Sequence, residues 1–228
     1  MMFGGFEKIT LIDYPGKVAC MAYTIGCNFR CPYCHNPELV DETVETKLGE
    51  DAVLGFLDTR RGMLDGIVIT GGEPTIHDDL PAFVEQVKAA GFLVKLDSNG
   101  TRPAMLADLI RRRLVDYIAM DVKAPLARYS EIVSRPVDVD AIRESIRLLM
   151  AASIEYEFRT TVIKSMLSLE AVEAIGREIE GAKRYYLQRF VPTKLLNPQF
   201  RRATVYTDAE FENLRDRLSS YVQFCGIR

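Results

Sequence analysis

Strand and helix patterns alternate along this chain from residue 18 onward, and this alternation constrains the fold more than any other feature. Short apolar runs rich in Val, Ile, Tyr or Phe predict strands at 18–24, 66–70, 92–98, 116–122, 155–163 and 184–190, with 221–226 as a candidate seventh. Between them, apolar residues recur in steps of three and four and predict helices within 49–61, 78–91, 102–113, 138–152, 169–181 and 208–221. Strands that alternate with helices in this way predict a mostly parallel sheet.

The number of repeats limits the architecture further. About six strand–helix units are too few to close an eight-stranded barrel, and an open doubly wound sheet is the competing arrangement. No linker rich in Ser, Gly or Pro interrupts the pattern. We therefore expect one domain over residues 1–228, with 1–17 as a lead-in and 18–226 as the repeats.

Charge and hydropathy exclude several classes of function. The formal net charge is -3, from 29 basic and 32 acidic side chains, so no excess of positive charge exists to hold a nucleic acid backbone. No apolar stretch approaches the roughly 18 residues that a membrane span needs, and the N-terminus lacks the pattern of a signal peptide. Three of the five cysteines are clustered, unlike those of a secreted disulfide framework. We expect a cytoplasmic protein.

Polar or glycine-rich segments follow four successive predicted strands. The cysteines come after the first strand and "GGEP" after the second, while the third ends in "DSNG" and the fourth in "DVK". Because the carboxyl ends of parallel strands share one edge of a sheet and ligands bind there, we expect a ligand site at this edge.

The cysteine spacing points to a metal centre. Cys27, Cys31 and Cys34 form a C-x3-C-x2-C loop, which supplies three ligands where a closed zinc site or a fully protein-ligated cubane needs four. A zinc site completed by His35 or a distant residue would make this a non-catalytic zinc-binding module. A [4Fe-4S] cluster with one iron open to a non-protein ligand fits the count better.

This loop resembles that of the radical S-adenosylmethionine (SAM) enzymes, which have an aromatic residue before the last cysteine, here Tyr33. The resemblance implies a partial (β/α)6 barrel, a [4Fe-4S] cluster and SAM. In the family, the open iron binds the amino and carboxylate groups of SAM, and an electron from the cluster cleaves SAM to a 5'-deoxyadenosyl radical. It also implies that "GGE" seats the SAM amino group. Asp97-Ser98 resembles a segment of the activases of glycyl radical enzymes, in which an Asp followed by a hydroxyl residue lies near the SAM carboxylate and a monovalent cation. The SAM contacts implied in this way are Tyr33, Gly71, Gly72, Glu73, Asp97, Ser98, Asp121, Lys123, Phe190 and Val191.

Two further elements resemble the activases of glycyl radical enzymes, most of all those of anaerobic ribonucleoside-triphosphate reductase. They are Asp13-Tyr14-Pro15-Gly16, before the first repeat strand, and Cys34-His35-Asn36. The likeness implies a glycyl radical enzyme as protein substrate, reduced flavodoxin or ferredoxin as electron donor, and no side chain acting as acid or base. Asp13, His35 and Arg159 would face the partner protein. The alternative within the family is an enzyme acting on a small molecule, similar to 7-carboxy-7-deazaguanine synthase.

Overall fold

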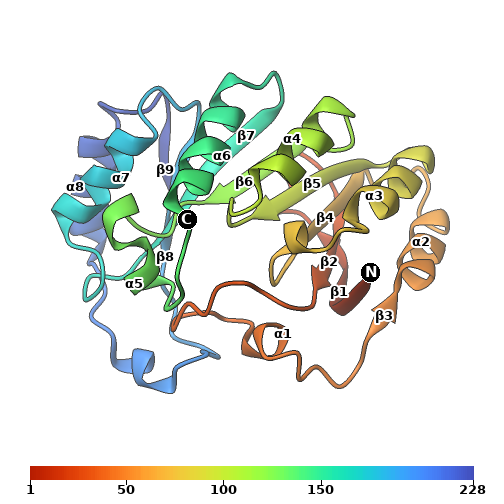
Figure 1. Ribbon diagram of the computed structural model, residues 1–228, viewed down its shortest axis with the longest axis horizontal. Coiled ribbons are helices and arrows are strands. Elements are labelled where there is room, and N and C mark those ends of the chain that lie inside the picture. The colour runs from red at the N-terminus through yellow and green to blue at the C-terminus, as the bar shows by residue number, and fades with distance from the viewer. The chain divides into compact units, whose positions relative to one another are not determined.

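The computed structural model describes all residues, 1–228, and has an α/β fold (Figure 1). Its strands are β1 (Met2–Thr10), β2 (Ala19–Thr24), β3 (Leu48–Gly49), β4 (Gly66–Gly71), β5 (Leu93–Ser98), β6 (Tyr117–Asp121), β7 (Glu155–Val162), β8 (Tyr185–Arg189) and β9 (Cys225–Ile227). Its α-helices are α1 (Pro37–Val40), α2 (Glu50–Asp58), α3 (Leu80–Ala89), α4 (Pro103–Arg111), α5 (Tyr129–Ile132), α6 (Val139–Ala151), α7 (Leu169–Glu178) and α8 (Asp208–Leu218). Short 3-10 helices cover Pro74–Ile76, Leu126–Arg128 and Pro198–Arg202.

The chain divides into two compact units. The first consists of residues 1–28, 38–98 and 104–118, and the second of residues 29–37, 99–103 and 119–228. Strand β6 contributes its first two residues to the first unit and its remaining residues to the second. That the chain acts as one domain stays a prediction.

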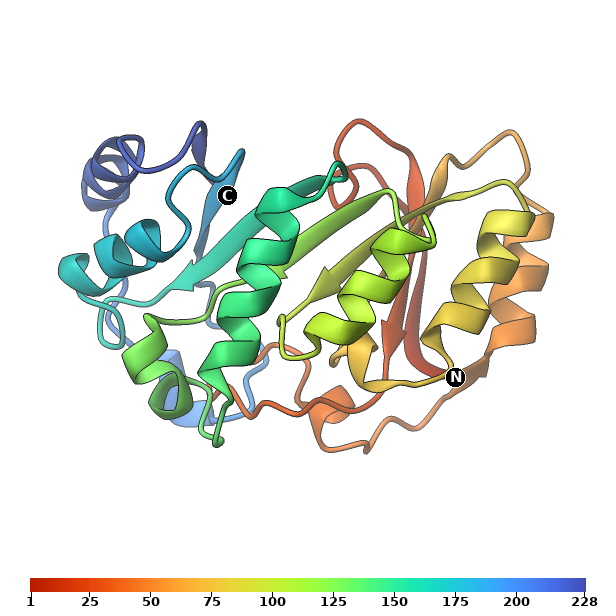
Figure 2. The ribbon, with the colours of Figure 1, turned by 45° about the horizontal axis from the view of Figure 1, so that its top comes forward.

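In the first unit the strand order is β3-β1-β2-β4-β5, followed by the start of β6. Strand β1 is antiparallel to both of its neighbours, whereas β2, β4 and β5 run parallel. Helices α2, α3 and α4 cover one face of this part of the sheet (Figure 2). The apolar residues of α3 at the predicted three- and four-residue steps are buried, which confirms the helical period there.

In the second unit the end of β6 is followed by β7, β8 and β9, and the last three strands pair in parallel. Helix α6 runs along this part of the sheet and α7 packs beside α8 (Figure 2). The N-cap of α8, Thr207, forms a capping box with Glu210, and Asp138 and Ser168 cap α6 and α7. Polar caps at these positions explain why the helices begin where the sequence pattern predicts.

All six predicted helices and the first six predicted strands are present, some of them shorter than the patterns. The candidate seventh strand, predicted over 221–226, is displaced toward the C-terminus as β9 and shares only residues 225 and 226 with the prediction. The lead-in 1–17 differs from the prediction, because residues 2–10 form a strand of their own. Two glycines, Gly4 and Gly5, weaken its strand pattern, and its stability comes from pairing with β2. Short helices such as α1 and α5 carry too few residues to show a period.

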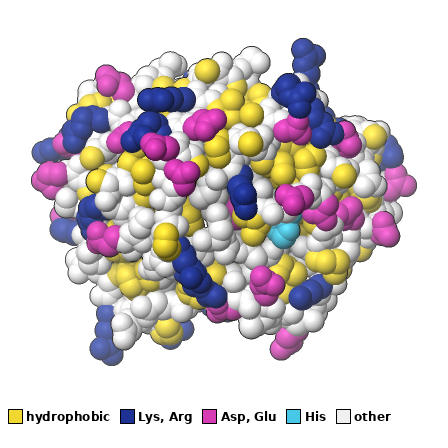
Figure 3. All heavy atoms as spheres, in the orientation of Figure 1, with side chains coloured by type: hydrophobic (Ala, Val, Ile, Leu, Met, Phe, Trp, Pro, Cys, Tyr) yellow, Lys and Arg dark blue, Asp and Glu magenta, His cyan; other side chains and the backbone are white.

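Acidic and basic side chains are interspersed over the visible face in Figure 3. This distribution agrees with the small net charge and leaves no single-sign patch for a polyanion on this face. No helix has both the length and the apolar character that crossing a membrane requires.

Candidate active site

The cysteine loop begins in the first unit, directly after β2. Gly26, whose φ is +90°, donates its N–H to the Leu39 carbonyl over 2.8 Å, and its own carbonyl accepts from the Glu73 N–H at 2.9 Å. Cys27 is half-buried and follows this clamped glycine. The structure therefore brings the predicted "GGE" segment against the start of the cysteine loop.

Gly71 and Gly72 are required by a close backbone approach. A Cβ on Gly72 would lie 1.8 Å from the Gly26 carbonyl oxygen, and a Cβ on Gly71 would lie 2.5 Å from the Thr24 nitrogen. Gly71 also has a φ of +110°, which side chains rarely adopt. The paired glycines thus allow two loops of the protein itself to meet, in addition to any approach to a ligand.

The Glu73 side chain is almost fully buried, with 1% of its surface exposed. Its Oε1 accepts hydrogen bonds from the Thr75 N–H at 3.0 Å, the Thr75 hydroxyl at 2.5 Å and the Ser98 hydroxyl at 2.9 Å. Donors that converge on one oxygen fix the orientation of a carboxylate. Ser98 therefore contacts Glu73, a contact that the sequence did not predict.

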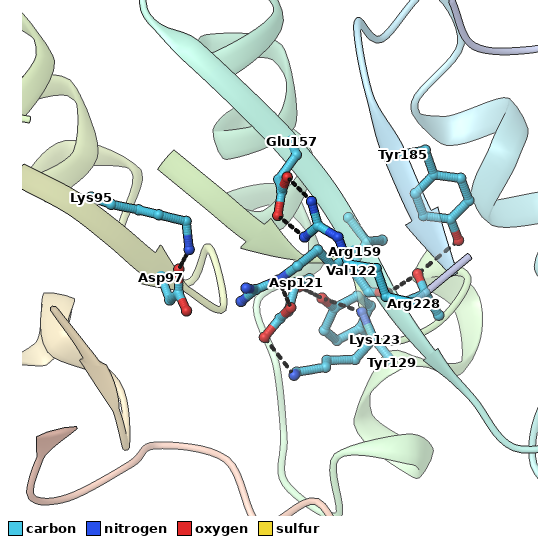
Figure 4. A network of polar contacts seen from close by, with 11 residues as sticks. Lys95, Asp97, Asp121, Val122, Lys123, Tyr129, Glu157, Arg159, Tyr185 and Arg228 are labelled. Carbon is cyan, nitrogen blue, oxygen red and sulfur yellow. Dashed lines mark hydrogen bonds and ion pairs between the residues drawn. The ribbon is translucent and has the colours of Figure 1, made fainter. Parts of the chain in front are cut away.

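Asp97 and Ser98 were expected to share one environment, but their side chains have different partners. As neighbours on β5 they point to opposite faces of the sheet. Asp97 forms an ion pair with Lys95, which lies two residues earlier on the same strand (Figure 4).

Asp13 lies at the other end of β2 from the cysteine loop. It accepts a hydrogen bond from the Thr10 hydroxyl, and Thr10 pairs with Ala19 at the start of β2. The loop that leads to Cys27 begins after Thr24, at the opposite end of the strand. The structure thus does not bring Asp13 and Cys27 together within the first unit.

The second unit contains the rest of the cysteine loop, which backbone hydrogen bonds anchor at three points. The Arg30 N–H donates to the Val133 carbonyl at 3.0 Å. The Pro32 carbonyl accepts from the Asn197 N–H at 2.9 Å, and the Cys34 carbonyl accepts from the Leu196 N–H at 3.0 Å. Cys34 also donates its N–H to the Cys31 carbonyl at 2.9 Å, so these two cysteines lie on one turn. No three His, Cys, Asp or Glu side chains are gathered as a metal-ligand group.

The surroundings of this turn fit an additional group bound by thiolates. The Tyr33 hydroxyl is buried without a nitrogen or oxygen partner, and it lies near the Cys31 sulfur, where a hydrogen bond from it lowers the pKa of the thiol. Burial raises the pKa of the Cys31 thiol to about 11, and the positive charge of Lys123 opposes this shift. A nearby cation and soft sulfur donors suit an iron–sulfur cluster, whose binding favours the thiolate.

Asp121, Lys123 and Arg159 form an ion triad at the end of β6 (Figure 4). The Asp121 carboxylate lies 2.9 Å from Lys123 Nζ and 2.8 Å from Arg159 Nε. Burial disfavours the charged carboxylate, but the positive charges of Arg159 and Lys123 outweigh it and hold the pKa of Asp121 well below its ordinary value. The same attraction raises the pKa of Lys123, against the effect of burial. The predicted residues Asp121, Lys123 and Arg159 are therefore brought together.

The structure also brings His35 to Phe190 and Val191, two of the predicted SAM contacts. His35 Nε2 lies 2.8 Å from the Val191 carbonyl oxygen, and its ring lies 5.8 Å from that of Phe190. The Val191 side chain is 57% exposed. The segment after β8 is thus positioned by the residue that follows the last cysteine of the loop.

Three charged residues escaped prediction, two on strands and one directly after β9. Lys95 is buried on β5, and Glu157 on β7 is fully buried and forms a bidentate pair with Arg228 at 2.7 and 3.0 Å (Figure 4). A charged residue inside an otherwise apolar strand could have indicated these pairs, because a buried charged side chain needs a partner of opposite charge. Cys20 and Cys225 are buried thiols, and burial raises the pKa of each to about 12.

Comparisons with known proteins show the family to which this chain belongs. The family model described as the radical SAM superfamily matches residues 21–176. A candidate glycyl-radical enzyme activating enzyme of Methanocaldococcus jannaschii is 32% identical over 232 residues, which cover 100% of this chain and 95% of that protein. A 7-carboxy-7-deazaguanine synthase of Aquifex aeolicus is 38% identical over 78 residues, 33% of each chain.

Solved structures show the same fold. A radical SAM methyltransferase from Sphaerobacter thermophilus superposes with a TM-score of 0.70 at 15% identity, covering 96% of this chain and 68% of that one. SuiB of Streptococcus suis, bound to S-adenosylmethionine, gives a TM-score of 0.68 at 12% identity and covers 91% of this chain. This chain spans 49% of the length of SuiB. The predicted fold class, an α/β partial barrel with a mostly parallel sheet, is confirmed.

Proposed function

Because this chain belongs to the radical SAM superfamily, we propose that it is an activase that generates a glycyl radical on a partner enzyme. The observation that carries the proposal is its likeness to the Methanocaldococcus jannaschii protein, which extends over the whole of this chain. Membership of the superfamily implies a [4Fe-4S] cluster and SAM. When bound, these groups supply the one-electron cleavage of SAM that leads to hydrogen abstraction, and the protein positions them.

The protein's first task is to hold the cluster. Cys27, Cys31 and Cys34 would bind three irons as thiolates, and the positive charge of Lys123 near Cys31 supports that ionised form. The hydrogen bonds that tie the loop to residues 133, 196 and 197 support a loop held in place before the cluster binds.

Its second task is to orient SAM. By family resemblance, Gly71, Gly72 and Glu73 would seat the amino group, since the buried Glu73 carboxylate can accept from an ammonium. Lys123 is suited to pair with a carboxylate and Asp121 with ribose hydroxyls. The remaining members of the proposed SAM site are Tyr33, Asp97, Ser98, Phe190 and Val191.

The partner protein would meet Asp13, His35 and Arg159. We take anaerobic ribonucleoside-triphosphate reductase as the partner, and reduced flavodoxin or ferredoxin as the electron donor, from the resemblance in the Asp13 element and in Cys34-His35-Asn36. Within the first unit Asp13 lies at the amino end of β2, opposite the end that leads to Cys27, so its assignment to the partner surface rests on the family resemblance alone.

A second candidate function is radical chemistry on a small molecule. It is favoured by the 38% identity to 7-carboxy-7-deazaguanine synthase, although that likeness covers one third of the chain. The full-length relative makes the activase the stronger proposal.

The test is anaerobic reconstitution of the full chain with iron and sulfide, reduction with dithionite, and addition of SAM with the reductase from the same genome. We expect 5'-deoxyadenosine by chromatography and a glycyl radical in the EPR spectrum of the reductase. Replacement of any one of the three loop cysteines by serine should abolish bound iron and both products, whereas Cys225→Ser, remote in sequence from the loop, should retain them.

Other results of this test would favour one of the two alternative functions. SAM cleavage without a glycyl radical, together with turnover of a pterin substrate, would favour the small-molecule enzyme. Bound zinc in place of iron, with SAM intact, would favour a zinc-binding module.

A further inference from the structure

Lys95 is a lysine in the interior of the first unit. Only 2% of its side-chain surface is exposed. Val68 pairs with it on the neighbouring strand β4, and Val94 precedes it on β5. Its ammonium forms an ion pair with Asp97, whose side chain is 12% exposed (Figure 4). Lysine is almost never buried to this degree without a charged partner.

The position of the pair follows from strand geometry. Residues two apart on a strand point to the same face, so β5 presents the ammonium and the carboxylate side by side. The ammonium also lies 6.0 Å from the centre of the Tyr117 ring, within the range of a cation–π contact. Lys95 is therefore held over Asp97 by the sheet itself.

This pair leaves Asp97 with a positive charge already beside it. A metal cation bound to the same carboxylate would have to approach a buried ammonium, and like charges repel strongly where water is excluded. The family resemblance implies a monovalent cation near Asp97, and the residues present do not fit one.

We propose that Lys95 is a positioning residue that serves as the built-in counter-cation of Asp97, in place of a monovalent metal ion. The inference rests on the proposed function, because it concerns the carboxylate assigned to the SAM site. It means that this chain binds SAM equally well with or without potassium or sodium. It also means that the loss of the Lys95 charge removes the repulsion that keeps such an ion away from Asp97.

The experiment compares thermal unfolding and SAM binding in potassium, sodium and tetramethylammonium chloride at one ionic strength. Unfolding is measured on both the iron-free and the reconstituted full chain, so that the result does not depend on SAM cleavage. The variants are Lys95→Met, the double variant Lys95→Met with Asp97→Asn, and Lys88→Met as control. Lys88 forms an ion pair with Asp116 at 2.7 Å in the same unit, with both side chains more exposed.

For the wild type we expect the same Tm and the same SAM Kd in all three salts. Lys95→Met should lower the Tm by roughly 10 °C in tetramethylammonium and regain part of the loss in potassium or sodium. The double variant should regain stability in every salt, because it removes both buried charges. Lys88→Met should lower the Tm by a few degrees, equally in each salt.

Three results would overturn the inference. They are a wild-type SAM Kd that falls tenfold or more on adding potassium or sodium, a Lys95→Met variant as stable as the wild type, and a Lys95→Met variant whose Tm falls equally in the three salts. If Lys95→Met does not fold, the SAM Kd of the wild type in the three salts still tests the inference. A glycyl radical absent from an otherwise cation-independent protein would count against the proposed function alone.

Discussion

Replacement of Gly72 by alanine tests whether the two loops of the first unit meet as closely as the structure shows. The added Cβ would lie 1.8 Å from the Gly26 carbonyl oxygen and 2.6 Å from its carbon. Both are backbone atoms, so no flexible side chain can move aside. Ordinary contact begins at 3.4 Å, and the loops must therefore separate by roughly 1.6 Å.

The separation has a calculable effect on stability. It would disrupt the hydrogen bonds from the Gly72 N–H to Thr24 and from the Glu73 N–H to Gly26, both 2.9 Å long. Each contributes about 0.5–1.5 kcal/mol, and overpacking adds about 1–3 kcal/mol. We expect the free energy of unfolding to fall by about 4 kcal/mol, which lowers the Tm by roughly 8–16 °C in a chain of this size.

Gly55→Ala is the matched control. Gly55 lies on the exposed side of α2, where an added Cβ has nothing within 4 Å. Alanine is a better helix former than glycine, so this variant should gain about 0.5–1 kcal/mol. The change from glycine to alanine should therefore lower the free energy of unfolding at position 72 and raise it at position 55.

Urea and thermal unfolding of the iron-free chain measure both changes, and bound iron after reconstitution gives a second reading. Because Gly26 directly precedes Cys27, Gly72→Ala should also reduce iron loading. A Gly72→Ala variant within about 0.5 kcal/mol of the wild type would refute the close approach of the two loops.

Two further predictions concern buried charges of the second unit. The pKa of Asp121 is lower in the folded than in the unfolded chain, so its ionisation stabilises the fold above the unfolded pKa, and this stability is lost as the pH falls through the folded value. The difference in unfolding free energy between the wild type and Asp121→Asn should hence be largest at pH 7 and shrink below about pH 4, whereas a constant difference would contradict the triad. Arg228→Ala removes the bidentate partner of fully buried Glu157 and should lower the free energy of unfolding by about 3 kcal/mol in urea. Adding Glu157→Leu should restore part of that loss, and no recovery would argue against a pairing effect.

The sequence predicted elements whose signals are local. Buried apolar positions three and four residues apart located α3, and a continuous apolar run located β4. Strand β1 was missed because its pattern is weak and its pairing with β2 depends on residues up to about 20 positions away. Pairing over such a separation leaves no mark on the periodicity of either segment.

In the candidate site, too, local signals could be read from the sequence and long-range contacts could not. Cysteine spacing identified the loop, but the carbonyl of Val133 that receives the Arg30 N–H is about 100 residues away along the chain. Ser98 could be placed at a strand end, yet its bond to Glu73 depends on how two strands align. Lys95 was overlooked because lysine ordinarily marks a solvent-exposed position, and only the acidic residue two positions later, on the same face, indicated otherwise.

The two units differ in the ratio of positive to negative charges in their buried ion pairs, and this ratio affects which ligands each unit can bind. Lys95 and Asp97 neutralise each other, so that pair carries no residual charge to attract a cation. Asp121 is flanked by two cations, Lys123 and Arg159, and the positive charge of Lys123 acts on the Cys31 thiol. A positive charge in a poorly hydrated place favours thiolates, carboxylates and other anions over neutral ligands. The second unit is therefore electrostatically prepared for the anionic partners of a cluster-binding loop, whereas at Asp97 the first unit already supplies the cation.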